Sequence, residues 1–305
     1  MKLPRRKFMQ LTAALAAPAV VSDFAWALDY PTRPVHMIVG LAAGGPTDVC
    51  ARIVGQHLSE QMGEQFPVEN RTGAGGSLAT QVVINAPPDG YILLFGGPNV
   101  TIGASLYRKL SNVLEELTPI SGVMRFPNVM VITPSLPVST VAEFIAYARE
   151  HPGQLSMASS GIGASPHLTG EYFKHMTKLD MVHVPYRGSS AVYPDLISGK
   201  VHVLFDNLGG PVLALVRSGK LRALGVTSAK RWPLVPDIPA IAETVSGYEV
   251  NVWYGILAPR VTPSDIVTTL HAAVNRSLTD PKIVARFAED GGLPMTCRAM
   301  SSRNF

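Results

Sequence analysis

The sequence predicts an α/β protein in which largely parallel strands are connected by crossover helices. Short apolar runs alternate with amphipathic segments along the chain, and turns rich in glycine and proline separate them. No sustained repeat or low-complexity stretch interrupts this alternation. A chain of 305 residues is long enough to bury a substantial core and to form two domains of ordinary size.

The first predicted unit is a strand, a glycine-rich loop and a helix. Residues 35–40 form an apolar run of strand length, and the loop 41–46 follows them. Behind this loop, apolar residues recur at helical spacing, so a helix is expected with Thr47 or Asp48 as its cap. The apolar positions of this helix are Val49, Ile53, Val54, Leu58 and Met62.

Two more units of the same kind follow. A strand at residues 66–69 leads through the loop 70–76 into a helix at about residues 77–86. After a Pro-Pro-Asp-Gly turn, a strand at residues 91–95 ends in the loop 96–99. We expect the three loops to lie at the same ends of neighbouring strands.

The rest of the chain continues the alternation. Thr262 or Ser264 is expected to cap the last long helix. A fourth glycine-rich loop, at residues 159–167, again follows a strand and precedes a helix. Strands are expected at residues 129–132, 155–158, 181–184, 201–205, 221–226 and 253–257, and helices at residues 141–150, 165–176, 190–197, 211–217 and 263–278.

The glycine-rich loops have two interpretations. Glycine makes tight turns wherever the backbone needs a positive φ, and that alone accounts for any single loop. In an open α/β sheet, however, ligands bind outside the carboxyl ends of the strands, where helix N-termini present free N–H groups and partial positive charge. Such ends suit anions, and glycine lets the backbone approach a carboxylate closely. Four loops of one type favour an anion-binding site.

The N-terminus predicts a twin-arginine export signal. Arg5 and Arg6 precede an apolar stretch at residues 11–21, and small residues at Ala25 and Ala27 suit a signal peptidase. Cleavage is expected after Ala27, so residues 1–27 are a leader and the chain acts in the periplasm. A retained membrane anchor is the alternative, but a bilayer span needs about 20 residues, and this shorter run contains Pro18.

Removal of the leader leaves a nearly neutral chain of 278 residues (305 minus 27). The whole chain has 26 Lys and Arg against 22 Asp and Glu, and the leader holds four basic residues and one acidic residue, which leaves 22 against 21. Without blocks of Lys and Arg, nucleic acid and anionic lipid are not expected partners. Cys50 and Cys297 can pair in an oxidising compartment, but two free thiols are expected because a large core needs no disulfide.

A series of short motifs runs through the mature chain in order. They are residues 41–48 with Arg52, 68–76, 88–91, 160–168 with Gly170 and Glu171, 184–188, 205–207, 219–224, 236–239 and 253–255. Together they resemble the Bug family, the extracytoplasmic solute receptors of tripartite tricarboxylate transporters. Each motif is weak alone, but the set covers nearly the whole mature chain.

The resemblance implies a two-lobed periplasmic-binding-protein fold of the second type, with a cleft between the lobes and two crossover segments as the hinge. Residues 28–129 and 248–305 would form the first lobe, and residues 130–247 the second. The crossings would lie near residues 125–131 and 248–253. The family likeness also implies a monomeric receptor, with no enzymatic activity, metal or cofactor, which delivers a small organic acid to the membrane subunits of its transporter.

Receptors of this family hold a ligand carboxylate largely through backbone and hydroxyl groups, often through water. The matching positions of this chain are therefore expected to line the two walls of the cleft. One wall would contain Gly44, Gly45, Thr47 and Asp48, and the other Ser160, Gly161, Gly163, Ser165, His167, Tyr186, Arg187, Gly188 and Asp206.

The chain departs from the family pattern at several positions. Leu41 and Ala43 stand where an aromatic residue and a proline are usual, and Thr72 replaces a proline. Ala164 lacks the common hydroxyl group, which predicts a ligand with one hydrogen-bonding group fewer, or a more apolar ligand. Residues 297–305 have no apolar periodicity. A truncation or a frame change would explain this segment, and either is expected to remove part of the first lobe's cover and to lower stability.

Some of these residues have a second interpretation. His167, Glu171 and His175 recur every four residues and can form a zinc site, but each step turns about 40° past a full helical turn and no fourth ligand is evident. His167 is better interpreted as a donor toward the cleft. Asp48 can bind solute or cap its helix, and Arg187 can pair with a ligand carboxylate or with Asp206.

The competing functional classes are an enzyme and a signalling receptor. A hydrolase needs a nucleophile elbow of the Gly-x-Ser-x-Gly type, and the sequence contains none. It also lacks a complete dinucleotide fingerprint and a phosphate-binding P-loop. A receptor that hands its solute-bound state to a membrane sensor would share every feature described above, so it stays open as the alternative to transport.

Overall fold

The computed structural model describes residues 29–106 and 113–296. The predicted leader, Cys297 and the atypical segment 297–305 lie outside these ranges. Within them, no helix combines the length and the apolar character that a bilayer crossing requires.

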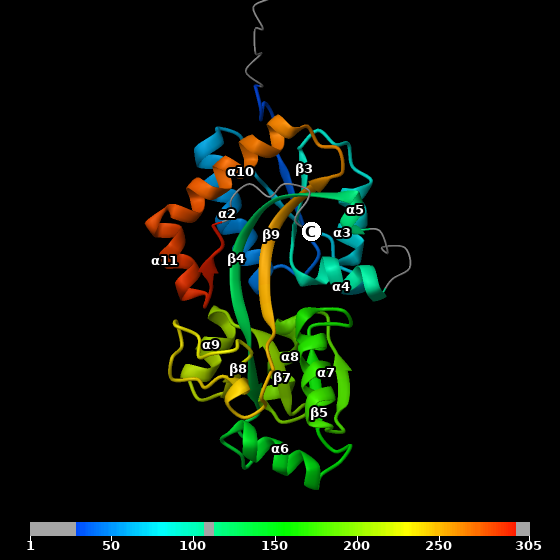
Figure 1. The fold of residues 1–305 in the computed structure, drawn as a ribbon, viewed down its shortest axis with the longest axis vertical. Helices are drawn as coiled ribbons and strands as arrows, with labels where there is room; N and C mark the ends of the chain where they lie inside the picture. The colour runs from blue at the N-terminus through cyan, green and yellow to red at the C-terminus, as the bar shows by residue number, and fades with distance from the viewer. Residues whose placement is uncertain (1–28, 107–112, 297–305) are drawn as a thin grey trace, which may run out of the picture.

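Two lobes lie one above the other, and two long strands run between them (Figure 1). These strands are β4 (Leu117–Ile132) and β9 (Asn251–Pro259), which pair antiparallel with Pro127 opposite Asn251. Phe126 and Val252 belong to the core of the first lobe, whereas Met130 and Val250 contact the core of the second. The chain therefore passes from one core to the other at neighbouring positions of β4 and β9.

The first lobe is built on the strand order β2-β1-β3-β9-β4. The first three strands are parallel, as predicted, and β9 is antiparallel to both of its neighbours. Helices α2, α10 and α11 cover one face of this sheet, and α3, α4 and α5 cover the other. The elements are β1 (His36–Val39), α2 (Pro46–Met62), β2 (Val68–Asn70), η1 (Ala74–Gly76), α3 (Ser77–Ile84), β3 (Ile92–Gly96), α4 (Pro98–Leu106), α5 (Val113–Glu116), α10 (Ser264–Thr279), α11 (Pro281–Glu289) and β10 (Leu293–Pro294).

The second lobe continues the sheet from the far half of β4, in the order β4-β7-β5-β6, with β8 also paired to β4. Side chains of β4 alternate between two cores, since Met130 packs with α6 and α7 while Val129 and Val131 pack with α8 and α9. The elements are α6 (Val141–Glu150), β5 (Ser156–Ser159), α7 (Ser165–Thr177), β6 (Val182–Pro185), α8 (Ser189–Ile197), β7 (Val203–Asn207), α9 (Gly210–Arg217), β8 (Arg222–Val226) and η3 (Ile241–Glu243).

The α/β class is confirmed, but the sheet is more antiparallel and β4 much longer than predicted. Pro119, Gly122 and Pro127 suggest breaks in a strand. In the structure, register shifts between Pro119 and Ser121 and between Gly122 and Met124 absorb the irregularity, and the strand continues.

Both predicted helix caps are also wrong. Helix α2 begins at Pro46 behind Gly45, and α10 begins at Ser264 behind Pro263, without a side-chain cap in either case. Proline suits the first helical position because its missing N–H would have no partner there. The glycine-proline pair at residues 45–46 was therefore the better signal for the start of α2.

Candidate functional site

A cleft separates the two lobes, and its walls are the glycine-rich loops. Its wider part has a volume of about 750 Å³. The first lobe contributes two loops to this cavity and the second lobe contributes two more. They are residues 40–42 and 72–76 from the first lobe, and residues 160–162 and 185–188 from the second. The four loops therefore meet across one crevice.

A smaller inner cavity of about 20 Å³ lies between the lobes and has room for roughly one water molecule. The first turns of three helices reach it: Thr47 of α2, Pro98 of α4 and Ser165 of α7. The crossing strand β9 contributes Tyr254 to the same cavity. Its full lining is Leu41, Thr47, Pro98, Asn99, Ser160, Ala164, Ser165, Pro166, Asn207, Val252 and Tyr254.

The electrostatics of this cavity favour an anion. Each of the three helices presents first-turn N–H groups that have no partner within the helix, together with the positive end of its dipole. Since α2 and α4 belong to the first lobe and α7 to the second, this partial charge converges from both sides. Among residues 29–106 and 113–296, none that lines the inner cavity is charged, and Arg187 is the charged residue on the wider one.

The lobes touch at the cleft. A Cβ atom placed on Gly75 would lie 2.5 Å from the carbonyl oxygen of Ile162 on the opposite lobe. A Cβ on Gly188 would lie 3.5 Å from the Cβ of Ala42. Farther away, Trp232 Nε1 donates to the carbonyl of Gly291 at 2.8 Å. The structure is therefore a closed arrangement, in which backbone of one lobe approaches backbone of the other.

A hydrogen-bond chain crosses the inner cavity. The hydroxyl of Tyr254 on β9 accepts from Thr47 Oγ1 at 3.0 Å and from Asn207 Nδ2 at 3.1 Å. Thr47 belongs to the first lobe and Asn207 to the second, so the chain links both lobes through the crossing strand. Asn207 Oδ1 is buried and has no partner among the described residues. A water molecule or a solute group that donates a hydrogen bond would satisfy this acceptor.

Asp48 has a structural role next to this site. Its buried carboxylate accepts from the N–H of Gly44, from Asn70 Nδ2 and from two nitrogens of Arg52, all at 2.9 Å. Burial opposes ionisation, but the bonds from Arg52, Gly44 and Asn70 outweigh it and hold the pKa of Asp48 below its usual value. Asp48 therefore fixes the loop before α2 rather than capping the helix or facing the cavity.

Asp206 is fully buried and does not line either cavity. Its carboxylate accepts from Ser189 Oγ at 2.6 Å, from Tyr193 OH at 2.7 Å and from the N–H of Asn207 at 2.9 Å. Burial raises the pKa of Asp206, although these three bonds oppose the shift. The ion pair between Asp206 and Arg187, one of the two predicted roles of Arg187, does not form, because internal donors occupy both carboxylate oxygens of Asp206.

His167 lies at the start of α7, and its Nδ1 accepts the N–H of Gly163 at 3.2 Å. The prediction of a donor toward the cleft is therefore wrong for this nitrogen. Its ring stacks on His183 with centroids 4.3 Å apart. Burial lowers the pKa of His167, which favours the neutral ring.

The predicted residues thus divide into two groups. The seven that line a cavity are Thr47, Ser160, Gly161, Ser165, Tyr186, Arg187 and Gly188. The six that do not are Gly44, Gly45, Asp48, Gly163, His167 and Asp206, which neighbour the lining or support it.

Sequence reasoning left several lining residues out of the predicted set. Tyr254 and Asn207 belong to motifs recognised in the sequence, but they lie far from the glycine-rich loops along the chain. The loops 72–76 and 96–99 had been recognised as equivalent to the others. The expected alignment of these loops at one edge of the sheet was the signal from which their residues could have been added to the predicted lining.

Comparison with known proteins supports this assignment of the fold. The sequence model of the tripartite tricarboxylate transporter family receptors matches residues 50–304. BugT of Bordetella pertussis is 34% identical over 300 residues, which covers 96% of this chain and 89% of BugT. R. palustris Rpa4515, solved with adipate, has 39% identity and a TM-score of 0.82, and the match covers 87% of this chain and 89% of that one.

A further solved structure is MatC of Rhodopseudomonas palustris with bound malate. It is 31% identical, with a TM-score of 0.81, and the match covers 87% of this chain and 90% of MatC. The fold is that of the periplasmic binding proteins, as the resemblance implied. The chain belongs to the tripartite tricarboxylate transporter receptor family, which includes the Bug proteins.

Proposed function

We propose that this protein is a periplasmic solute-binding receptor, not an enzyme, that captures a small carboxylate between its lobes. It then delivers the solute, as a monomer, to the membrane subunits of a tripartite tricarboxylate transporter. The observation that carries the proposal is the convergence of helix N-termini from both lobes on one cavity, whose lining, in the described part of the chain, is uncharged. Two relatives were solved with small carboxylates, one with adipate and one with malate, which supports a ligand of this chemical class.

The proposed contacts are backbone amides and hydroxyl groups rather than a buried base. Thr47, Ser160 and Ser165 present hydroxyls at the inner cavity, and Arg187 lines the wider part. The N–H groups of Gly161 and Gly188 donate to Ser159 Oγ and to the carbonyl of Ser160, so a solute would have to compete with these two bonds. Asp48 and Asp206 support the walls. The unpartnered Asn207 Oδ1 favours a solute, or a bound water, that donates a hydrogen bond beside its carboxylate.

The proposed lobes are residues 28–129 with 248–305, and residues 130–247. The change of core between Phe126 and Met130 in β4 lies close to the first of these boundaries. At the second boundary the change comes slightly later, because Tyr248 and Val250 still pack in the core of the second lobe, whereas Val252 of β9 packs in that of the first. Closure of the lobes over the solute would provide contacts that the open form lacks, and this difference shifts the equilibrium toward the closed form.

The proposed route to the periplasm is twin-arginine export with cleavage after Ala27. Replacement of both Arg5 and Arg6 by Lys should retain the precursor in the cytoplasm, because the route requires the arginine pair. The mass of the exported wild-type chain should correspond to a start at Leu28. An exported double variant, or a periplasmic chain that keeps residues 1–27, would contradict this proposal.

A thermal-shift screen of carboxylates tests the binding function. Adipate, malate, other di- and tricarboxylates, aromatic acids and acidic amino acids should include at least one that raises the melting temperature of the mature chain. A ligand at about a hundred times its Kd adds roughly 2.7 kcal/mol to the free energy of unfolding. The function is wrong if no anionic solute produces a shift, or if cationic analogues produce the same shift.

Two variants, each with one alanine replaced by leucine, test the location of the binding site. Ala164 is buried and lines the inner cavity, so Ala164→Leu should fill it and abolish the shift by the best solute. Ala43 is exposed and lines neither cavity, so Ala43→Leu should keep the shift. Each variant is compared with its own unliganded melting temperature. A full shift in Ala164→Leu would place the solute elsewhere.

A further inference from the structure

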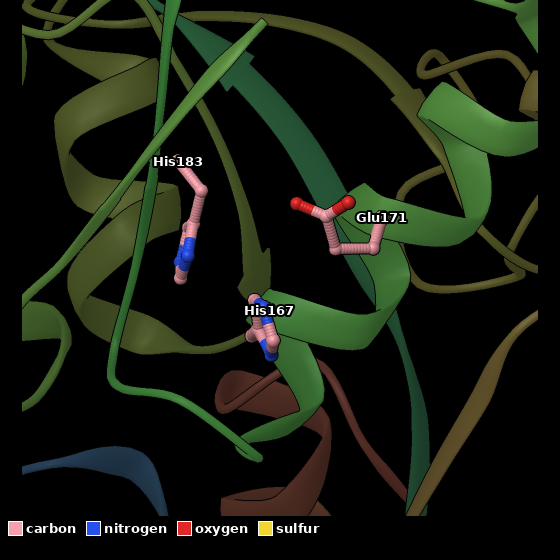
Figure 2. A group of neighbouring side chains, drawn as sticks. All are labelled: His167, Glu171 and His183. Atoms are coloured by element: carbon pink, nitrogen blue, oxygen red, sulfur yellow. The ribbon is translucent and has the colours of Figure 1, made fainter.

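A cluster of three side chains that can bind metal lies on the second lobe. His167 and Glu171 project from α7, and His183 projects from the edge strand β6 (Figure 2). One nitrogen or oxygen atom of each lies within 4.8 Å of the others, and all three residues are partly exposed. An ion can therefore reach the cluster from solvent.

We propose that this cluster binds a divalent transition-metal ion, for which Zn²⁺ is the best match. Two imidazoles and one carboxylate form a ligand set that zinc accepts, with a water in the fourth position. Mg²⁺ and Ca²⁺ prefer sites built from oxygen. The sequence pattern pointed to His175, but His175 is exposed and is not a member of the cluster. The fold instead brings in His183, which β6 places beside α7.

The surroundings of His183 orient its ring. Its Nε2 lies 2.7 Å from Ser159 Oγ, which also accepts the N–H of Gly161 at 3.2 Å. If the ring donates its Nε2 proton to this hydroxyl, Nδ1 keeps a free lone pair for a metal. Burial lowers the pKa of both histidines, and the neutral ring is the form that coordinates.

The neighbouring charge opposes the metal. Lys174 Nζ lies 3.0 Å from Glu171 Oε1, so an ion must share or displace this partner. Replacement of Lys174 by Met removes the charge and keeps an apolar side chain of similar length. The proposal therefore predicts tighter metal binding in Lys174→Met than in the wild type.

Metal binding must also change the cleft loop. A neutral imidazole that coordinates a metal through one nitrogen carries its proton on the other. If the metal takes Nδ1 of His167, the lone pair is used, and if it takes Nε2, Nδ1 carries the proton. In either case the Gly163 N–H loses its acceptor. The amide of Gly163, between the lining residues Ile162 and Ala164, reports directly on the ion.

The test is a titration of the mature, untagged chain with Zn²⁺ in competition with a chromogenic chelator. All proteins carry Cys297→Ala, so that this thiol does not contribute. We expect one equivalent of Zn²⁺ to bind, with at least about tenfold weaker binding in His183→Ala, since changes to mere supporting residues already cost 10- to 100-fold. His175→Ala is the matched control and should bind as the parent does.

The amide spectrum of ¹⁵N-labelled protein provides the second readout. Zn²⁺ should shift the Gly163 resonance in the parent and in His175→Ala, but not in His183→Ala. The proposal is overturned if no ion binds at about 100 μM Zn²⁺, if His175→Ala weakens binding as much as His183→Ala, or if Gly163 does not respond. Because no organic solute is present, failure here leaves the proposed receptor function untouched.

Discussion

The close approach of Gly75 to Ile162 across the cleft provides a sharp test of closure. Gly75 has φ +64° and ψ 20°, and a Cβ on it would lie 2.5 Å from the Ile162 carbonyl oxygen across the cleft. Gly75→Ala should therefore prevent complete closure without entering the inner cavity, which Gly75 does not line. Any residue other than glycine also strains this left-handed backbone, at a cost of about 1–2 kcal/mol.

The size of the effect follows from the contact distance. Ordinary contact of a Cβ begins at 3.4 Å, so the Ile162 carbonyl must retreat from 2.5 Å by about 0.9 Å. A hydrogen bond of about 2.9 Å from that lobe to the solute would lengthen to about 3.8 Å, which is outside bonding range. Loss of one bond to a charged solute costs about 1.5–3 kcal/mol, or roughly 10- to 150-fold in Kd.

The assay is calorimetric titration with the best solute from the screen. Gly63→Ala is the matched control, because Gly63 has φ +79° at the end of α2 and a Cβ there would meet nothing within 4 Å. Both variants should lose a similar amount of stability, but only Gly75→Ala should lose affinity. Equal Kd values for the two variants would show that this contact does not limit closure, and the reasoning would be refuted.

Three further predictions concern the support of the site. Asp48→Ala should lower the free energy of unfolding by roughly 2–4 kcal/mol in chemical denaturation, because Gly44, Asn70 and Arg52 all lose this buried carboxylate as their acceptor. Asp89→Ala, which removes an exposed ion pair, should cost at most about 1 kcal/mol. Equal losses would contradict the structural role of Asp48. The pKa of Asp48 is held below 3.8, so its stabilisation is present above that pH and lost as the pH falls through the lower folded pKa. The difference in free energy of unfolding between wild type and Asp48→Asn should thus be constant between about pH 7 and 5 and should decrease only below pH 3.8. A decrease that begins at higher pH would show that the pKa of Asp48 is not lowered. Tyr254→Phe should cost about 1–3 kcal/mol, since Thr47 and Asn207 both donate to its hydroxyl, and an unchanged denaturation midpoint would exclude these bonds as a stabilising link.

Local patterns predicted the units of the fold well where the physical cause was local. The apolar run before residue 40, the glycine-rich loop and the helical spacing behind it correspond to β1 and α2. The structure brings four such loops to one cleft, as the strand ends suggested. The helix α11, in contrast, was not recognised, although Asp280 caps it and Pro281 begins it.

Errors arose where distant residues decide the conformation. No local signal shows that β4 continues through Pro119 and Pro127, because pairing with β9 holds it extended. Asp206 looked like a residue of the cleft in sequence, yet Ser189 and Tyr193 enclose it. His183 had no place in the predicted metal stripe, because its approach to α7 depends on the order of strands in the sheet.

The sequence by itself determined the α/β class, the glycine-rich loops and the family, because strand and helix periodicity and turn chemistry depend on residues close together in the chain. Only the tertiary structure decided which amides and hydroxyls face one cavity, which carboxylates are enclosed, and that His167, Glu171 and His183 meet. Those relations depend on how β4 and β9 join the two lobes and on the order of strands, and short-range patterns do not contain that information.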